Sequence, residues 1–235
     1  MTGKIGKATN KIPDNTGGTL PNKRINKAAL RQEALARRRA LDPIQRRRQE
    51  QALAAKVMSM LADHDSTTGF IAMYSALGSE LPTDSLAYDL RQAGFKLAYP
   101  VCLPKKKMAF YVDSITESNH AKARNTQPNV NTTQPLSATL KNDPTRIIST
   151  AELALLKIVL PQHIRLVLLP LVAFDERCYR LGYGQGYYDR YLAHPQLSAS
   201  CWGLAFNEQL IQRIPHQNHD VPLNAVLTAT RNFWR

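Results

Sequence analysis

The stretch that decides the fold of this 235-residue chain reads Leu166-Val-Leu-Leu-Pro-Leu-Val-Ala-Phe-Asp-Glu-Arg-Cys-Tyr-Arg-Leu-Gly-Tyr-Gly-Gln-Gly-Tyr-Tyr-Asp-Arg190. It opens with an unbroken apolar run, Leu166 to Leu169, which is typical of a strand buried on both faces of a sheet. Glycines then occur at alternate positions, at Gly182, Gly184 and Gly186. Because ligands of open α/β sheets bind where such strands end, the stretch predicts both a central strand and a binding site.

The glycine-rich part has the chemistry of an anion site. Without Cβ atoms the main chain can approach a phosphate closely and point successive N–H groups at it. Arg180 precedes the glycines and can fork onto a phosphate, and Asp189 follows them as an oxygen ligand suited to Mg²⁺. A helix beginning near Tyr187 would direct its positive end at the same anion. The loop matches neither a P-loop nor G-x-G-x-x-G, so a plain tight turn stays open as an alternative.

Short strands and helices alternate on both sides of this stretch. Strands are predicted at 70–74, 96–101, 108–112, 202–206 and 225–229, and helices at 83–93, with Thr83 as the cap, and at 150 to about 160. A strand, helix and strand in that order predict a parallel pair with a right-handed crossover. We therefore expect an α/β fold, an open and mostly parallel sheet flanked by helices in three layers.

The amino-terminal third is expected to begin outside the sheet. Residues 24–41 and 43–63 have helical composition, and Asp42-Pro43 separates them as an N-cap followed by a proline at the first helical position. Residues 1–22 are polar without periodicity, which predicts a disordered tail. Residues from about 113 to 143 lose periodicity too, which predicts an exposed insertion or, as an alternative, a lid. The remainder, 23–235, is expected to be one domain.

The positive charge is concentrated near the amino terminus. The chain has a net charge of +13, and residues 1–56 hold 14 Lys and Arg against 4 Asp and Glu, whereas the rest hold 17 against 14. The densest clusters are Arg37–Arg39 and Arg46–Arg48. A solvated helix face, attraction for phosphate-bearing small molecules and nucleic-acid binding all remain open, although no aromatic residues are interleaved for base stacking.

Cysteine content and hydropathy indicate the compartment. Three scattered cysteines are too few for a disulfide framework, and no apolar run is long enough to cross a bilayer. No apolar stretch of a secretory signal follows the first Met. We expect a reduced, cytoplasmic protein that binds no membrane.

Several motifs together resemble one family. Phe174-Asp175 followed by Arg180-Leu-Gly-Tyr-Gly-Gln-Gly-Tyr-Tyr-Asp189 is similar to the signature of the 5-formyltetrahydrofolate cyclo-ligase family, also called 5,10-methenyltetrahydrofolate synthetases. Other elements follow in the family's order: Lys27-Ala-Ala-Leu-Arg31, Tyr74 with Glu80 and Thr83-Asp84, Phe206-Asn-Glu-Gln209, Ile214-Pro215 and His219-Asp220. The chain departs from the pattern at Leu171 and Cys178, where glycines are usual, and its nearest counterpart to a usual Glu-Pro is Asp143-Pro144.

The resemblance implies an activity. Family members use ATP and Mg²⁺ to convert 5-formyltetrahydrofolate to 5,10-methenyltetrahydrofolate, releasing ADP and phosphate. The formyl oxygen is a poor leaving group, so it is phosphorylated before N10 closes the ring and phosphate departs. The implied sheet is similar to that of sugar-phosphate isomerases and CoA-transferases.

The resemblance also implies site residues. Lys27, Arg180 and Tyr187 would be catalytic, and Asp189 and Asp220 would hold Mg²⁺. Ser75 and Glu80 would bind the folate, with Glu80 at the donor edge of the pterin, and residues Tyr183 to Tyr187 would touch both ligands. The ATP-binding set would be Lys27, Arg31, Arg180, Leu181, Gly182, Tyr183, Gly184, Gln185, Gly186, Tyr187 and Tyr188.

The resemblance also implies binding partners, and two other functions remain as alternatives. We expect 5-formyltetrahydrofolate and ATP as ligands, no nucleic acid, and a monomer. One alternative is a basic nucleic-acid-binding protein, which requires binding that weakens steeply with salt. Another is a phosphate-binding isomerase of the same fold, which requires no ATP.

Overall fold

The computed structural model describes residues 26–113, 136–216 and 220–235, so the predicted disordered tail, 1–22, lies outside the described residues. The helices are α1 (Lys27–Arg39), α2 (Pro43–Leu61), α3 (Asp84–Gln92), α5 (Leu136–Asn142), α6 (Thr150–Leu153) and α7 (Tyr187–Leu192). The strands are β1 (Phe70–Ala72), β2 (Leu97–Leu103), β3 (Lys107–Val112), β4 (Ile158–Val159), β5 (Ile164–Pro170), β6 (Ala173–Phe174), β7 (Arg180–Leu181), β8 (Ser200–Leu204), β9 (Ala225–Leu227) and β10 (Asn232–Trp234).

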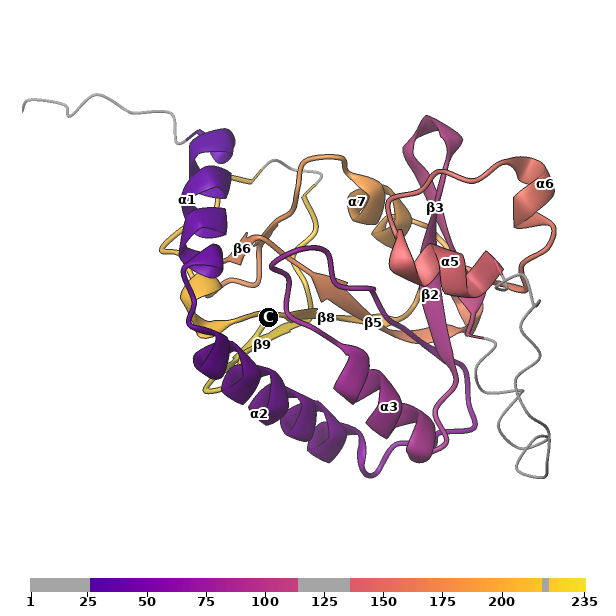
Figure 1. Cartoon of the computed structure of the whole chain (residues 1–235), viewed down its shortest axis with the longest axis horizontal. Coiled ribbons are helices and arrows are strands. Elements are labelled where there is room, and N and C mark those ends of the chain that lie inside the picture. The colour runs from indigo at the N-terminus through magenta and orange to yellow at the C-terminus, as the bar shows by residue number, and fades with distance from the viewer. Residues whose placement is uncertain (1–25, 114–135, 217–219) are drawn as a thin grey trace, which may run out of the picture.

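The main sheet has eight strands in the order β10-β9-β8-β5-β1-β2-β3-β4. Figure 1 labels β9, β8, β5, β2 and β3 of this sheet. Strands β9, β8, β5, β1 and β2 are parallel neighbours, and β10, β3 and β4 add antiparallel pairs toward the edges. The predicted parallel pair is β1 and β2, joined through α3. The expectation of an open, mostly parallel α/β sheet is confirmed, with β5 near its centre.

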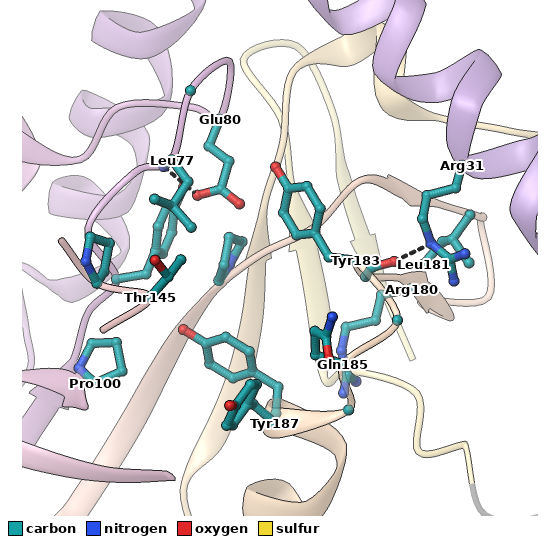
Figure 2. A pocket seen from close by; sticks show the side chains of 18 of the residues that line it. Arg31, Leu77, Glu80, Pro100, Thr145, Arg180, Leu181, Tyr183, Gln185 and Tyr187 are labelled. Carbon is teal, nitrogen blue, oxygen red and sulfur yellow. Dashed lines mark hydrogen bonds between the residues drawn. The ribbon is translucent and has the colours of Figure 1, made fainter. Parts of the chain in front are cut away.

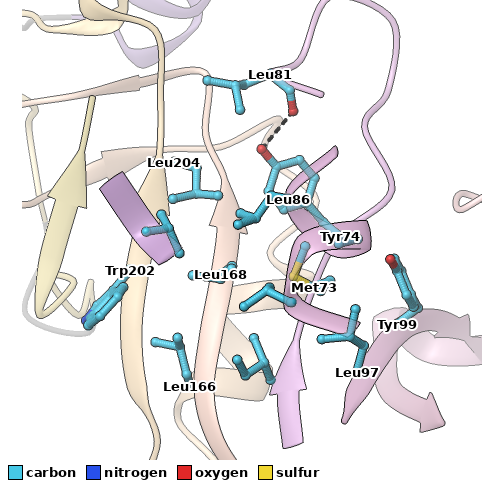
Figure 3. Close-up of a cluster of buried hydrophobic side chains, with 14 of the residues drawn as sticks. Met73, Tyr74, Leu81, Leu86, Leu97, Tyr99, Leu166, Leu168, Trp202 and Leu204 are labelled. Atoms are coloured by element: carbon cyan, nitrogen blue, oxygen red, sulfur yellow. Dashed lines mark hydrogen bonds between the residues drawn. The ribbon is translucent and has the colours of Figure 1, made fainter. Parts of the chain in front are cut away.

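The central strand buries both of its faces. Leu166 and Leu168 of β5 belong to a core shared with α2 and α3, part of which Figure 3 shows. Val167 and Leu169, which alternate with them, belong to a second core that includes Tyr191 of α7. Since successive side chains of a strand point to opposite faces, helices on both sides of the sheet give the expected three layers.

The boundary between α1 and α2 is the one that the sequence predicts. The Asp42 carboxylate accepts hydrogen bonds from the main-chain N–H groups of Ile44 (3.0 Å) and Gln45 (3.1 Å), and Pro43 occupies the first helical position. These bonds satisfy N–H groups that lack partners within a helix. Among the helices in the described ranges, none combines the length and the apolar character needed to cross a bilayer.

One predicted helix boundary is confirmed and another differs from the structure. Thr83 is the N-cap position of α3 as predicted, but its side chain makes no capping bond, because its hydroxyl donates to the carbonyl of Tyr74 (2.8 Å). The helix expected from 150 to about 160 ends at Leu153, and the chain then pairs with β3 as β4. A capping box of Ser149 and Glu152 starts this helix, but the tertiary strand pairing overrides its continuation.

The predicted insertion at 113–143 is partly a packed element. Residues 114–135 lie outside the described residues, but 136–142 form α5, and Leu140 is buried. Asp113 is buried as well and forms ion pairs with Arg91 and with Lys141 of α5 (2.5 Å for Lys141). The carboxyl-terminal end of this segment is therefore not an exposed loop, because a buried carboxylate fixes α5 against the sheet.

A two-stranded hairpin, β6 and β7, was not predicted. Its turn is organised by the fully buried Asp175, whose carboxylate accepts N–H bonds from Arg177 and Tyr179 (both 3.1 Å) and from Ile214 (3.0 Å). Cys178 lies in the left-handed region (φ 63°), where glycine is favoured. Cys178, where a glycine is usual in the family that the sequence resembles, therefore adopts a backbone conformation that glycine favours.

Leu171 fills space that Gly203 leaves empty. A Cβ on Gly203 would lie 2.5 Å from Cδ2 of Leu171 and 2.8 Å from Cδ1 of Leu223, and both leucines are buried. We expect Gly203→Ala to lower the free energy of unfolding by about 1–3 kcal/mol through overpacking, measured by urea denaturation. Adding Leu171→Ala should restore part of this loss. Gly182→Ala, where a Cβ meets nothing within 4 Å, should change stability by less than about 0.5 kcal/mol. Equal losses at the two glycines would contradict the packing argument.

Candidate functional site

A cavity of about 890 Å³ lies where several strands of the sheet end. Its walls come from α1, from the segment that follows β1, from the paired strands β2 and β3, and from the glycine-rich segment between β7 and α7. Pro170, the last residue of β5, also reaches it. The cavity therefore occupies the edge of the sheet at which the sequence placed a ligand.

The structure brings all of the predicted site residues to this one cavity. They lie in four parts of the chain, from Lys27 to Asp220. Those on its wall are Lys27, Arg31, Ser75, Glu80, Arg180, Leu181, Gly182, Tyr183, Gly184, Gln185, Gly186, Tyr187, Tyr188, Asp189 and Asp220. Their assignment to ATP, folate or metal stays a prediction, but their convergence around one space agrees with it.

Positive φ angles shape the glycine-rich segment. Gly184 (φ 93°) and Gly186 (φ 69°) adopt conformations that side chains disfavour, and Gly186 is the N-cap of α7. The Arg190 guanidinium donates to the carbonyl of Gln185 (2.7 Å) and to that of Lys106 (2.9 Å), so it ties the segment to the β2–β3 hairpin. The helix starts at Tyr187 as predicted, but it has only six residues, so loop N–H groups rather than a long helix would meet an anion.

Three cationic side chains lie on one side of the cavity. Arg31 of α1 donates from Nε to the carbonyl of Gly182 (2.7 Å), which connects the helix to the glycine segment (Figure 2). Lys27, one turn earlier, forms an ion pair with Asp220 (2.9 Å). Arg180 pairs with Asp189 and also donates to the carbonyl of Val221 (3.1 Å). Side chains expected to bind phosphates are therefore held beside the carboxylates expected to bind metal.

Asp189 and Asp220 fit a magnesium site of the kind that a nucleotide completes. Mg²⁺ is usually held by one or two carboxylates, waters and substrate phosphates, not by an all-protein cage. Among residues 26–113, 136–216 and 220–235, no group of three or more His, Cys, Asp and Glu side chains could hold a metal ion. Asp189 and Asp220 both lie on the wall of the cavity, where two carboxylates would suit a metal that arrives bound to a nucleotide.

Glu80 lies across the cavity from these cations. It is buried, and its carboxylate accepts the main-chain N–H of Leu77 (2.7 Å). Burial raises the pKa of Glu80, while the Leu77 hydrogen bond and the positive charge of Arg38 oppose that rise. The hydroxyl of Tyr183 faces the carboxylate (Figure 2). A buried carboxylate with spare acceptor capacity can bind a donor-rich ring edge.

Arg38 is a site residue that the sequence interpretation missed. It was one of six clustered arginines with no separate role, yet it lines the cavity and is 1% exposed. Lys27, Arg31 and Arg38 are spaced by four and seven residues, which places them within about 40° of one another on a helix. That shared face was the available signal, and Leu35 on the cavity wall continues it.

The second arginine cluster is not simply solvated either. Arg46 donates to the carbonyls of Arg38 (3.0 Å), Ser79 (2.8 Å) and Glu80 (3.1 Å), and its guanidinium lies 4.6 Å from the centre of the Phe206 ring. Arg46 thus fastens the Glu80 segment to the junction of α1 and α2. Part of the amino-terminal charge has a structural purpose that charge counting cannot reveal.

Comparisons with known proteins point to one family. A family model described as the 5-formyltetrahydrofolate cyclo-ligase family matches residues 23–229. The 5-formyltetrahydrofolate cyclo-ligase of Escherichia coli K12 is 28% identical over 201 residues, covering 83% of this chain and 96% of that protein. The mouse protein of the same name is 28% identical over 222 residues, covering 86% and 92%.

Solved structures resemble the fold. A 5,10-methenyltetrahydrofolate synthetase from Mycoplasma pneumoniae superposes with a TM-score of 0.64 at 22% identity, covering 87% of this chain and 99% of the other. The synthetase of Aquifex aeolicus superposes with a TM-score of 0.59 at 24% identity, covering 88% and 92%. At these identities the likeness supports the architecture.

Proposed function

This chain belongs to the 5-formyltetrahydrofolate cyclo-ligase family, and on that basis we propose that it is an ATP-dependent ligase that cyclises 5-formyltetrahydrofolate to 5,10-methenyltetrahydrofolate with Mg²⁺. The formyl oxygen attacks the γ-phosphorus of ATP, and ADP leaves. N10 of the folate then attacks the formyl carbon and loses its proton, and the C–O bond breaks to release phosphate. The departure of phosphate leaves the product with a positive charge shared between N5 and N10.

One observation supports this proposal most directly. A single cavity holds Arg31 and Arg180 on one side and the buried carboxylate of Glu80 on the other (Figure 2). Its volume of about 890 Å³ is at the upper end of the usual range for ligand sites, roughly 300–1,000 Å³. A polyphosphate and a pterin can therefore meet there, with the residues from Tyr183 to Tyr187 between them.

The residues would act mainly by positioning and charge neutralisation. Lys27, Arg31 and Arg180 would bind the ATP phosphates together with the main chain of residues 180–188, and Tyr187 would contact the reacting groups. Ser75 and Glu80 would orient the folate so that its formyl oxygen faces the γ-phosphate. Phosphoryl transfer needs little covalent help from a protein, so preorganised positive charge contributes most.

Asp189 and Asp220 would hold Mg²⁺ once the nucleotide is bound. The ion supplies charge neutralisation for the β- and γ-phosphate oxygens. Asp189 would then exchange its pairing with Arg180 for the metal, leaving Arg180 to the phosphates. The ion pair in the structure keeps both groups beside the cavity before ligands arrive.

We expect Asp189→Asn to raise the Mg²⁺ concentration for half-maximal activity about 10-fold, because an amide oxygen carries no negative charge. The Mg²⁺ dependence of ATP binding, followed by calorimetry, should move in parallel. Asp63→Asn, at an exposed position beyond α2, should leave both titrations unchanged. Identical Mg²⁺ titrations for the wild type and Asp189→Asn would remove this residue from the metal site.

The deciding experiment is an absorbance assay for the methenyl product. The purified chain with 5-formyltetrahydrofolate and Mg²⁺ should form it only when ATP is added, releasing one ADP for each product. No ATP-dependent product would reject the proposal, and activity on a sugar phosphate without ATP would favour the same-fold isomerase. Tight, salt-sensitive binding of RNA or DNA by the whole chain at physiological salt would favour the nucleic-acid alternative.

The surroundings of the site support further expectations. Arg38 and Arg46 direct their guanidinium groups inward, which leaves less of the basic cluster for nucleic acid. We expect a monomer, since all the residues proposed to bind the two ligands line one cavity of this chain. Cys102, Cys178 and Cys201 are free thiols, in keeping with a cytoplasmic location.

A further inference from the structure

Arg38 is a buried arginine on the wall of the cavity, on the helix that carries Lys27 and Arg31. It belongs to the last turn of α1, eleven positions after Lys27. Its side chain is among the largest that are fully buried in the described parts of the chain. Burying a guanidinium costs several kcal/mol unless its donors are satisfied, so what it contacts is informative.

Each guanidinium nitrogen of Arg38 has its own acceptor. Nε donates to the hydroxyl of Ser79 (3.0 Å), Nη1 to the carbonyl of Leu171 (3.2 Å), and Nη2 to the hydroxyl of Tyr183 (2.6 Å). Ser79 adjoins Glu80, Leu171 follows β5, and Tyr183 lies in the glycine segment. One planar, rigid group therefore joins three segments that form the walls of the cavity.

The bond to Tyr183 determines where that hydroxyl can donate. A phenol has one proton, and its oxygen already accepts from Arg38. Its proton is then available to an acceptor on another side, and the carboxylate of Glu80 faces it (Figure 2). Tyr183 can thus stabilise the ionised form of Glu80 while Arg38 holds the phenol in place.

We propose that Arg38 is a positioning residue of the folate site, which acts through Tyr183 to keep Glu80 oriented and ionised for the donor groups of the pterin. The inference rests on the proposed function for the identity of that ligand. It assigns a role to a side chain that the motif resemblance left without one.

The electrostatics around Glu80 agree with this role. The charge of Arg38 and the hydrogen bond of Tyr183 both lower the pKa of Glu80 against the effect of burial. The neighbouring tyrosine hydroxyls are neutral, because burial raises the pKa of each. The charged and titratable groups that face Glu80 from the surrounding elements are Arg38, Arg46, Tyr74, Tyr183 and Tyr188.

Steady-state kinetics provide the first test. We expect Arg38→Met to raise KM for 5-formyltetrahydrofolate about 10-fold, because a charge-assisted hydrogen bond to Tyr183 is lost, with KM for ATP changed less than about twofold. The fall of kcat/KM for the folate at acidic pH, the acid limb of its pH profile, should begin at a higher pH, because Glu80 would become protonated there. Arg38→Lys keeps the positive charge but loses the planar guanidinium with its several donors. It should therefore bring the pH dependence of kcat/KM closer to that of the wild type than it brings KM. Arg48→Met, at an exposed position in the second cluster, should change none of these values.

A second variant covers the case in which Arg38→Met does not fold. Tyr183→Phe keeps the ring and removes only the hydroxyl, and it should shift KM for the folate and the acid limb in the same directions. If Arg38 acts through Tyr183, the fold-increase in KM for the folate in the double variant should be smaller than the product of the fold-increases in the two single variants. Multiplicative effects, or equal increases in KM for ATP and for the folate, would overturn the inference.

A titration without ligands separates this inference from the proposed function. In protein labelled with ¹³C-glutamate, the carboxyl signal of Glu80 is identified by its loss in Glu80→Gln. Its pKa should be higher in Arg38→Met and Tyr183→Phe than in the wild type, and an unchanged pKa in both would overturn the role of Arg38. An inactive wild type with the expected pKa shifts would reject the proposed reaction while leaving the Arg38–Tyr183–Glu80 network intact.

Discussion

Replacing Arg180 with alanine should lower turnover about 10²- to 10³-fold, the usual cost of losing one preorganised charge stabiliser in a shielded site. The side chain of Arg180 is 7% exposed, and the structure holds it at the cavity wall between Asp189 and the carbonyl of Val221. A γ-phosphate that accumulates charge during transfer would lose its forked donor. In the ligand-free protein Asp189 would also lose its ion-pair partner.

The measurement is kcat at saturating ATP, folate and Mg²⁺, together with thermal unfolding to show that the fold is kept. Arg180→Lys retains the charge without the bidentate geometry and should recover only part of the activity. Arg231→Ala removes an exposed arginine paired with Glu176 and should leave kcat unchanged. Near-normal turnover in Arg180→Ala would remove this residue from the catalytic group.

Elements with strong local signals were predicted well. The apolar run of β5 and the Asp42-Pro43 boundary of α2 can be predicted because neighbouring residues alone determine them. The β6–β7 hairpin has two residues in each strand, too few for any periodicity. It forms because Asp175 is buried against Ile214, a contact between distant parts of the chain. Likewise α5 lies in a polar sequence and depends on Asp113, so no local pattern predicts it.

The candidate site also combines features of one local segment with contacts between distant parts of the chain. Chemistry concentrated in one segment, from Arg180 to Asp189, could be predicted from residue types, and the family resemblance added Lys27, Glu80 and Asp220. The ion pair of Lys27 with Asp220 could not be predicted, since it joins α1 to a residue 193 positions later. Arg38 was hidden among other arginines because burial, not residue type, distinguishes it from Arg37 and Arg39.

Replacing Glu80 with glutamine should lower kcat/KM for 5-formyltetrahydrofolate on the order of 100-fold, because a buried charged acceptor of hydrogen bonds is lost. Glutamine has nearly the same shape and can still accept the N–H of Leu77, so the loss would reflect the missing charge and acceptor. KM for ATP should change less than about twofold, since the phosphates would bind on the other side of the cavity. An equal loss of affinity for both substrates would show that Glu80 supports the cavity wall instead of binding the pterin.

The same variant should be no less stable than the wild type at neutral pH, which distinguishes a functional carboxylate from a structural one. Burial raises the pKa of Glu80 above its ordinary value, so the unfolded chain releases this proton at lower pH than the folded protein does. The ionisation of Glu80 therefore lowers the free energy of unfolding of the wild type as pH rises through the folded-state pKa of this group. Glu80→Gln has no ionisable group here and does not show this loss. Urea denaturation should show that the free energy of unfolding of Glu80→Gln increases relative to that of the wild type between acidic and neutral pH. Glu176→Gln, at an exposed carboxylate, should show no such trend. If Glu80→Gln instead lost stability relative to the wild type as the pH rose, the carboxylate would be stabilising the fold, and its position in the cavity would be no argument for a role in binding folate.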